Sequence, residues 1–168
     1  MTVFYAIEWK QSGEDMEWDS FYEALFLVAV PLDEADDMFI YQSNQEADEA
    51  ALFLEDFGLL EASHTVYQLH NPLVEDRFSD YGFTSNLNRC YLYEELVLPF
   101  IITSGEKQQI DMALLQIKED LIALDQAESP VLFIDKQMKE LMQGYADAYK
   151  ITISFLLSTN RINTSKME

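Results

Sequence analysis

The sequence predicts a helix-rich α+β domain, in which short N-terminal strands and acidic helices pack on a C-terminal bundle of two or three long helices. The chain has 168 residues, 49% of them hydrophobic, which is enough for one domain with its own core. Apolar residues alternate near the start and recur at helical spacing further along. We therefore expect a single domain over 1–168, with an acidic part at about 1–86, a helical part at about 87–158 and a frayed tail at 159–168.

The acidic part is expected to begin with a strand followed by a helix. Residues 2–9 alternate weakly and are rich in β-branched and aromatic residues, which favours a strand. After Gly13, a helical stripe is formed by Trp18, Phe21, Tyr22, Leu25, Phe26 and Ala29. Asp15 is a suitable N-cap for this helix, and Pro31 ends it.

An acidic run leads to a second helix. Residues 33–37 contain four acids, which suit a first helical turn because the N-terminal end of a helix dipole is positive. This run opens a short segment whose apolar end is 38–41. Ser43 and Asn44 then precede a helix near 45–58, which has alanines, Leu54 and Phe57 on one side and acids on the other.

The rest of the chain is expected to be mainly helical. Residues 64–70 alternate as in a strand, and 75–86 have the composition of a loop. Helical spacing then predicts three helical segments, and their apolar rows run from Leu87 to Ile101, from Ile110 to Leu124 and from Ile134 to Leu156. Pro99 would kink or end the first segment, Ser129-Pro130 would begin the third, and 151–155 fit a short strand equally well. No internal repeat is detected.

Charge is the most informative feature of this sequence. The formal net charge is -21, and residues 11–76 contain 17 acids with no Lys or Arg. Residues 96–168, in contrast, contain 10 acids and 7 bases. Because nucleic acids and anionic membranes carry the same sign of charge, the sequence argues against direct binding to either.

No motif for catalysis, metal binding or cofactor binding is found. The sequence lacks glycine-rich phosphate loops and the spaced Cys or His ligands of zinc sites. Cys90 lies in an apolar row, which is typical of a buried, inert thiol. His64 and His70 are six residues apart without a third ligand. We therefore expect no catalytic residue, no metal and no cofactor. The start resembles no signal peptide, so we expect a cytoplasmic protein.

One acid pattern resembles a known family. Glu14-x-x-Glu17 and Glu34-x-x-Asp37 are similar to the paired acid motif of the MazG-like nucleotide pyrophosphohydrolases. That resemblance implies an all-helical fold in which four carboxylates on two helices hold Mg²⁺, and the Mg²⁺ holds the phosphates of a nucleotide. A Mg²⁺-dependent nucleotide hydrolase is therefore one alternative function.

The charge pattern favours a binding protein over an enzyme. The carboxylates of residues 11–76 carry the charge of about eight or nine base pairs of duplex DNA. We expect a mimic of DNA charge that inhibits a basic DNA- or RNA-binding protein, of the anti-restriction, anti-CRISPR or transcription-factor antagonist type. An immunity protein or antitoxin against a basic nuclease toxin is the other alternative, and a homodimer stays open. The expected partner-binding residues are Glu14, Asp15, Glu17, Trp18, Asp19, Tyr22, Glu23, Asp33, Glu34, Asp36, Asp37, Glu46, Asp48, Glu49, Glu55 and Asp56.

Overall fold

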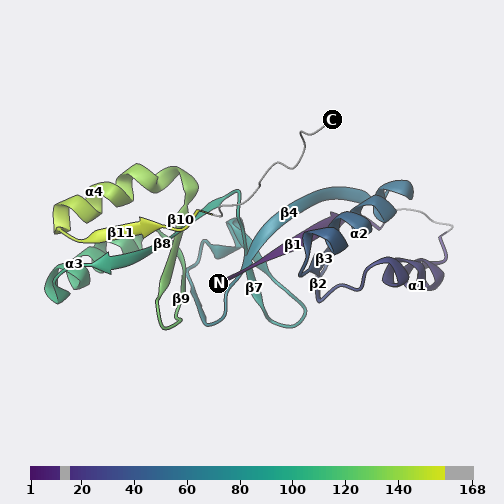
Figure 1. The fold of residues 1–168 in the computed structure, drawn as a ribbon, viewed down its shortest axis with the longest axis horizontal. Helices are drawn as coiled ribbons and strands as arrows, with labels where there is room; N and C mark the ends of the chain where they lie inside the picture. Colours follow the sequence, from purple (N-terminus) through teal and green to yellow (C-terminus); the bar gives the residue numbers. More distant parts are fainter. Residues whose placement is uncertain (12–15, 158–168) are drawn as a thin grey trace, which may run out of the picture.

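Two antiparallel sheets dominate the computed structural model, which describes residues 1–11 and 16–157 (Figure 1). The described residues form eleven strands and four α-helices, none longer than 13 residues. The predicted C-terminal bundle of long helices is therefore wrong, and the fold is a mixed α/β arrangement of two lobes that lie side by side along the long axis.

The N-terminal lobe, residues 2–68, carries its helices on one face of a sheet. Its elements are β1 (Thr2–Trp9), α1 (Trp18–Val28), β2 (Asp33–Ala35), β3 (Met38–Tyr41), α2 (Asn44–Asp56) and β4 (Leu60–Gln68). The strands are ordered β2-β3-β1-β4. This β-α-β-β-α-β arrangement is the split βαβ, or ferredoxin-like, topology.

The C-terminal lobe, residues 97–155, repeats that topology. Its elements are β8 (Val97–Ser104), α3 (Lys107–Ile117), β9 (Leu121–Asp125), β10 (Val131–Asp135), α4 (Lys139–Tyr149) and β11 (Thr152–Phe155), with 3-10 turns η2 (Lys118–Asp120) and η3 (Lys136–Met138). The strand order β11-β8-β10-β9 corresponds to β4-β1-β3-β2 of the first lobe. The chain thus contains a repeat of topology that is not detectable in its sequence.

The segment between the lobes completes both sheets. It contains β5 (Pro72–Val74), the 3-10 turn η1 (Phe78–Asp80), β6 (Gly82–Thr84) and β7 (Cys90–Tyr93). β5 pairs with β9, whereas β7 and β6 extend the first sheet beyond β4. That sheet rolls up, because the Asn86 N–H after β6 donates a hydrogen bond of 2.8 Å to the Glu34 carbonyl in β2. The inner face holds a core of Phe4, Ala6, Met38, Ile40, Val66 and Tyr91.

A shared apolar core joins the lobes. Tyr67 of β4 and Leu92 of β7 pack in one cluster with Ile122 of β9 and Phe133 of β10. The rings of Tyr67 and Phe133 are 6.2 Å apart. The second sheet is therefore covered by α3 and α4 on one face and by this cluster on the other.

Several of the predicted N-terminal elements are confirmed. β1, α1 and α2 lie where the periodicity places them. Ser43 caps α2 by accepting a hydrogen bond from the Glu46 N–H. Gly58 follows the helix with φ of +68°, the left-handed conformation in which glycine has little steric cost. The alternating segment predicted at 64–70 lies largely within β4. Residues 33–41, in contrast, form the β2–β3 hairpin and not the start of a helix.

Part of the C-terminal prediction is confirmed, since α3 and α4 overlap two of the predicted helical segments and β11 lies in the alternative strand at 151–155. The rest fails because strands buried on both faces lack alternation. β8 reads Val-Leu-Pro-Phe-Ile and its first four residues are all buried, so almost any spacing finds apolar residues there. Helical spacing therefore matches by coincidence in β7, β8, β9 and β10. Pro99 lies within β8, opposite Phe133, and does not end a helix. The predicted boundary near residue 86 falls inside the β6–β7 hairpin.

Candidate functional site: the acidic surface of the N-terminal lobe

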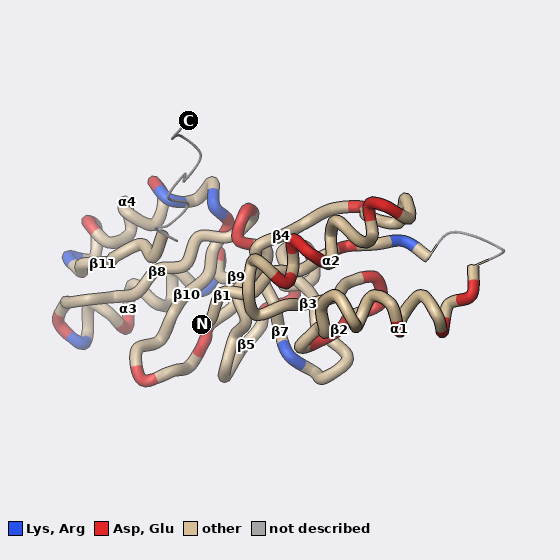
Figure 2. The backbone as a smooth tube through the Cα atoms, turned by 45° about the vertical axis from the view of Figure 1, so that its right-hand side comes forward, with Lys and Arg blue, Asp and Glu red and all other residues tan. Residues whose placement is uncertain are grey.

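The two lobes differ in charge although they share a topology. The sequence places 16 acids and one base in the N-terminal lobe, against 9 acids and 5 bases in the C-terminal lobe. Figure 2 shows Asp and Glu along α1, α2 and the hairpin between them. Most of the predicted site residues are exposed acids of these elements: Glu17, Asp19, Glu23, Glu34, Asp36, Asp37, Glu46, Asp48, Glu55 and Asp56. Glu49 is half-buried, and Glu14 and Asp15 lie outside the described residues.

Near the start of α2, uncharged side chains donate hydrogen bonds to the acids of the helix. The Ser43 hydroxyl donates to the Glu46 carboxylate at 2.8 Å and accepts from the Glu46 N–H at 3.2 Å, so the N-cap hydroxyl is bonded to Glu46 in both directions. The side-chain amides of Asn44 and Gln45 donate to Asp48 and Glu49 at 2.6 and 2.9 Å. Because these donors are uncharged, the acids are oriented and their negative charge is not neutralised.

The last turn of α2 places acids where the helix dipole opposes them. Glu55 and Asp56 are exposed at the C-terminal end, which is negative, and this turn contains no base. Their position costs stability. Solubility alone does not require acids at this position, since an acid on a strand or in a first turn would serve equally.

Acids from different elements converge near two tyrosines. Burial, reinforced by Glu34 and Glu46, raises the pKa of Tyr41 well above its ordinary value. Burial and then Glu34 also raise the pKa of Tyr22 on α1. Carboxylates of β2 and α2 therefore both act on Tyr41, and the β2 carboxylate also acts on Tyr22 of α1. The Tyr41 hydroxyl is buried, and no hydrogen-bond partner for it is found in the described part of the chain.

A second group of acids lies near a tyrosine on the other face of the same sheet. Burial raises the pKa of Tyr93 to about 12, with further contributions from Glu8, Asp37 and Glu95. Tyr41 packs with the helix-side core and Tyr93 with the inner core of the rolled sheet. Acids therefore act on tyrosines on both faces of this sheet and are not restricted to its helix side.

Asp33 has a structural role inside the N-terminal lobe and is not a surface acid. Its carboxylate is fully buried and accepts hydrogen bonds from the Ser85 and Tyr91 hydroxyls at 2.7 and 2.9 Å. The Arg89 guanidinium lies 3.7 Å away. Asp33 therefore ties β2 to the β6–β7 hairpin and is not available to a partner on the surface.

The predicted aromatic anchors belong to a ring cluster. Trp18 and Tyr22 are half-buried, and their rings contact Trp9 at 6.2 and 6.0 Å. Phe21 packs beside both rings. These ring contacts pack α1 against the sheet, so the two side chains are only partly exposed to a partner.

The three bases of residues 1–95 lie close to acids or rings. Lys10 pairs with Glu61, and Arg89 lies near Asp33. The Arg77 guanidinium lies 5.9 Å from the centre of the Tyr81 ring. Among the described residues, no ion pair involves an acid of α1 or α2.

The histidines do not form a metal site. His64 Nε2 lies 3.0 Å from Glu8, and its Nδ1 lies 3.5 Å from Glu95, whereas His70 hydrogen-bonds Thr2. No group of metal ligands is found within residues 1–11 and 16–157. Over these same ranges, no helix is both long enough and apolar enough to cross a lipid bilayer.

The structure does not support the nucleotide pyrophosphohydrolase resemblance. Glu34 lies in β2 and Asp37 in the turn before β3, whereas the resemblance implies acids on two helices. Glu17 is the N-cap residue of α1, and Glu14 lies outside the described residues.

One surface feature was missed by the sequence analysis. The end of α1 and the segment after it expose five large apolar side chains, which we name the α1 apolar patch: Phe26, Leu27, Val28, Val30 and Leu32. Leu27 and Val28 lie off the predicted helical stripe, so this signal was present in the sequence. The described surface also has an open groove of about 430 Å³ between α3 and α4, lined by Met112, Leu115, Gln116, Glu119 and Tyr149.

Comparison with known proteins assigns no family: no protein-family model matches the chain, and no curated protein and no solved structure matches it.

Proposed function

We propose that this protein binds a basic nucleic-acid-binding protein through the acidic surface of its N-terminal lobe and competes with nucleic acid for it. The carrying observation is the charge difference between two lobes of the same topology, with 16 acids and one base in one and 9 acids and 5 bases in the other. Since the topology is shared, the fold itself does not require the acidic surface. A negative surface potential accelerates the encounter of the protein with a basic cleft on its partner. The acidic surface then competes with nucleic acid for that cleft.

The test is a competition assay with a matched pair of variants. The protein is titrated into complexes of a labelled DNA duplex with each of several purified basic DNA-binding proteins and nucleases. We expect it to release the DNA from at least one of them, most strongly at low salt. One variant reverses Asp19, Glu23, Glu55 and Asp56 to Lys. Its control reverses Glu106, Asp111, Glu119 and Glu140 to Lys, which changes the net charge equally on the C-terminal lobe.

We expect the release of DNA to depend on which lobe carries the reversed charges. The N-terminal variant is expected to need about tenfold more protein for the same release, whereas the control stays close to wild type. Equal effects of the two variants would contradict the proposal, since they would show that net charge alone matters. No release of DNA from any of the proteins at low salt would also contradict it.

A second candidate function is supported by the α1 apolar patch. An immunity protein or antitoxin binds one nuclease, and buried apolar contacts keep much of its affinity at high salt. Affinity for one nuclease that falls less than tenfold between low and high salt would favour this function over DNA mimicry, for which we expect a steep salt dependence.

A further inference from the structure

The α1 apolar patch is a concentrated surface feature. Within seven residues, five side chains are exposed: Phe26 by 37%, Leu27 by 89%, Val28 by 42%, Val30 by 67% and Leu32 by 46%. Single exposed apolar residues are ordinary on protein surfaces, whereas a contiguous group marks a place where another molecule binds.

The outward side chains are not what holds α1 in place. Phe21 and Leu25 face the core and are 5% and 0% exposed, and Ala29 is also buried. Phe26 reaches Phe39 at its inner edge, with ring centres 6.4 Å apart. Leu27 and Val30 are thus dispensable for packing, so their exposure is available to a partner.

The patch is bordered by acids. Glu23 lies one helical turn before Leu27 on the exposed side of α1. Tyr22 contacts Phe26, with ring centres 6.0 Å apart, and is close enough to Glu34 for that acid to raise its pKa. Across residues 11–76 the sequence has no Lys or Arg, so no base of this segment offsets the border.

The acids that border the patch indicate what kind of molecule binds there. A second copy of this chain would bring another lobe with 16 acids and one base against the patch, and like charges would repel. An anionic lipid surface is opposed in the same way. We infer that the patch is a docking site for a cationic amphipathic segment, whose apolar side covers Leu27 and Val30 and whose Lys or Arg side chains meet Glu23 and Glu34. This inference rests on the proposed function, because it names the chemistry of the partner surface.

The experiment uses defined peptides, since a designed probe isolates each requirement. A labelled helical peptide with Leu on one side and Lys on the other is titrated with the full-length protein. Two further peptides keep the length: one replaces every Lys by Glu, and one disperses the Leu residues around the helix. The test variant is Leu27→Gln with Val30→Gln, accompanied by the milder Leu27→Ala. The control is Met112→Gln with Leu115→Gln, a pair exposed by 51% and 73% on α3.

We expect the amphipathic Lys peptide to bind wild type and the α3 control equally, and the α1 double variant about tenfold or more weakly. Equal binding to the α1 and α3 double variants would overturn the inference, and so would equal affinity for the Glu peptide or for the dispersed peptide. A wild-type dimer that becomes a monomer on Leu27→Gln would overturn it in favour of a second copy. Binding to zwitterionic vesicles that is lost in the α1 variant, without peptide binding, would overturn it in favour of a lipid surface.

The same variants separate this inference from the proposed function. If the α1 double variant binds the Lys peptide as the α3 control does and still releases DNA as wild type does, the docking site fails and the charge-based function stands. If the four-acid reversal on the N-terminal lobe leaves DNA release unchanged, the proposed function fails whatever the peptide does.

Discussion

The two lobes follow one topology and differ in what they expose. In the N-terminal lobe, α2 ends with Glu55 and Asp56 at the negative end of its dipole. In the C-terminal lobe, the last turn of the corresponding helix α4 carries one acid, Asp147, and the C-cap residue after it is Lys150, whose charge suits that end. The corresponding helix ends thus carry two acids with no base in one lobe, and an acid followed by a base in the other, so their charge differs although the topology is shared.

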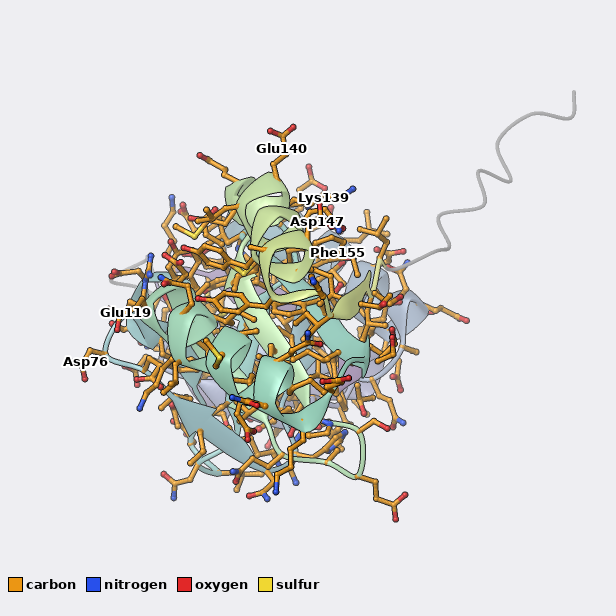
Figure 3. The ribbon with its side chains drawn as sticks, turned by 90° about the vertical axis from the view of Figure 1, so that its left-hand side faces the viewer. Asp76, Glu119, Lys139, Glu140, Asp147 and Phe155 are labelled. Atoms are coloured by element: carbon orange, nitrogen blue, oxygen red, sulfur yellow. The ribbon has the colours of Figure 1, made fainter. Side chains whose placement is uncertain are left out.

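The C-terminal lobe also combines its charges differently. Figure 3 shows the end of this lobe, where Glu140 and Asp147 project from α4 and Glu119 lies on another side. The Lys139 ammonium lies 5.6 Å from the centre of the Phe155 ring. Bases are thus interspersed with the acids there, so this lobe has a surface of mixed charge.

The largest expected effect tests whether the lobes unfold as one unit. Phe133→Ala empties a fully buried position in the shared core and should lower the free energy of unfolding by about 3–5 kcal/mol. Both tryptophans, Trp9 and Trp18, lie in the N-terminal lobe. In urea denaturation, we expect tryptophan fluorescence and far-UV circular dichroism to shift together. A fluorescence transition that stays at the wild-type midpoint would show that the lobes unfold independently.

A second, smaller effect concerns the closure of the N-terminal sheet. Asp33→Ala leaves the buried Ser85 and Tyr91 hydroxyls without their acceptor, and should cost about 3 kcal/mol in urea denaturation. Asp36→Ala, in the same hairpin but exposed, is the control and should change stability by less than about 0.5 kcal/mol. Similar losses in the free energy of unfolding for the two variants would show that Asp33 does not hold the β6–β7 hairpin to β2.

A third prediction concerns acid pH and the junction between the lobes. Burial alone raises the pKa of Asp125, but hydrogen bonds from the Met1 ammonium and from the N–H groups of Asn71 and His70 lower it below its ordinary value. A depressed folded-state pKa contributes stability above the ordinary pKa of about 4, and this stability is lost as the pH falls through the folded-state pKa.

Asp125→Asn should therefore destabilise the protein at pH 7 by about 1–3 kcal/mol and have a smaller effect at pH 3. Denaturation of wild type and variant at both values measures this difference, and the comparison cancels the general relief of repulsion at acid pH. An equal destabilisation at both values would show that the carboxylate charge of Asp125 is not what the donors stabilise.

The smallest expected effect is a change in stability when the charges at the helix ends are reversed. Glu55→Lys and Asp56→Lys should each raise the free energy of unfolding by about 0.3–1 kcal/mol at low salt, because each places a cation at the negative end of α2. Asp19→Lys, in the first turn of α1, separates the causes. If the dipole dominates, this substitution destabilises; if general repulsion dominates, it stabilises as the others do.

Sequence reasoning succeeded where an element has one buried side. α1 and α2 each bury one stripe, so their 3.6-residue period is visible. It failed for β8 and β10, which are buried on both faces and have no period. For the candidate site, it identified the exposed acids of α1 and α2 and included Asp33, whose burial depends on Ser85 and Tyr91, more than fifty residues away. Sequence proximity alone does not reveal such a contact.

The sequence by itself determined the total charge, its concentration in residues 11–76 and the two amphipathic helices of the N-terminal lobe, since these depend on residue type and local spacing. Tertiary structure decided the repeat of topology, the rolled first sheet and the exposure of Leu27 and Val30. The physical reason is that these features arise from contacts between segments far apart in the chain, which select the buried face of each strand and leave the end of α1 uncovered.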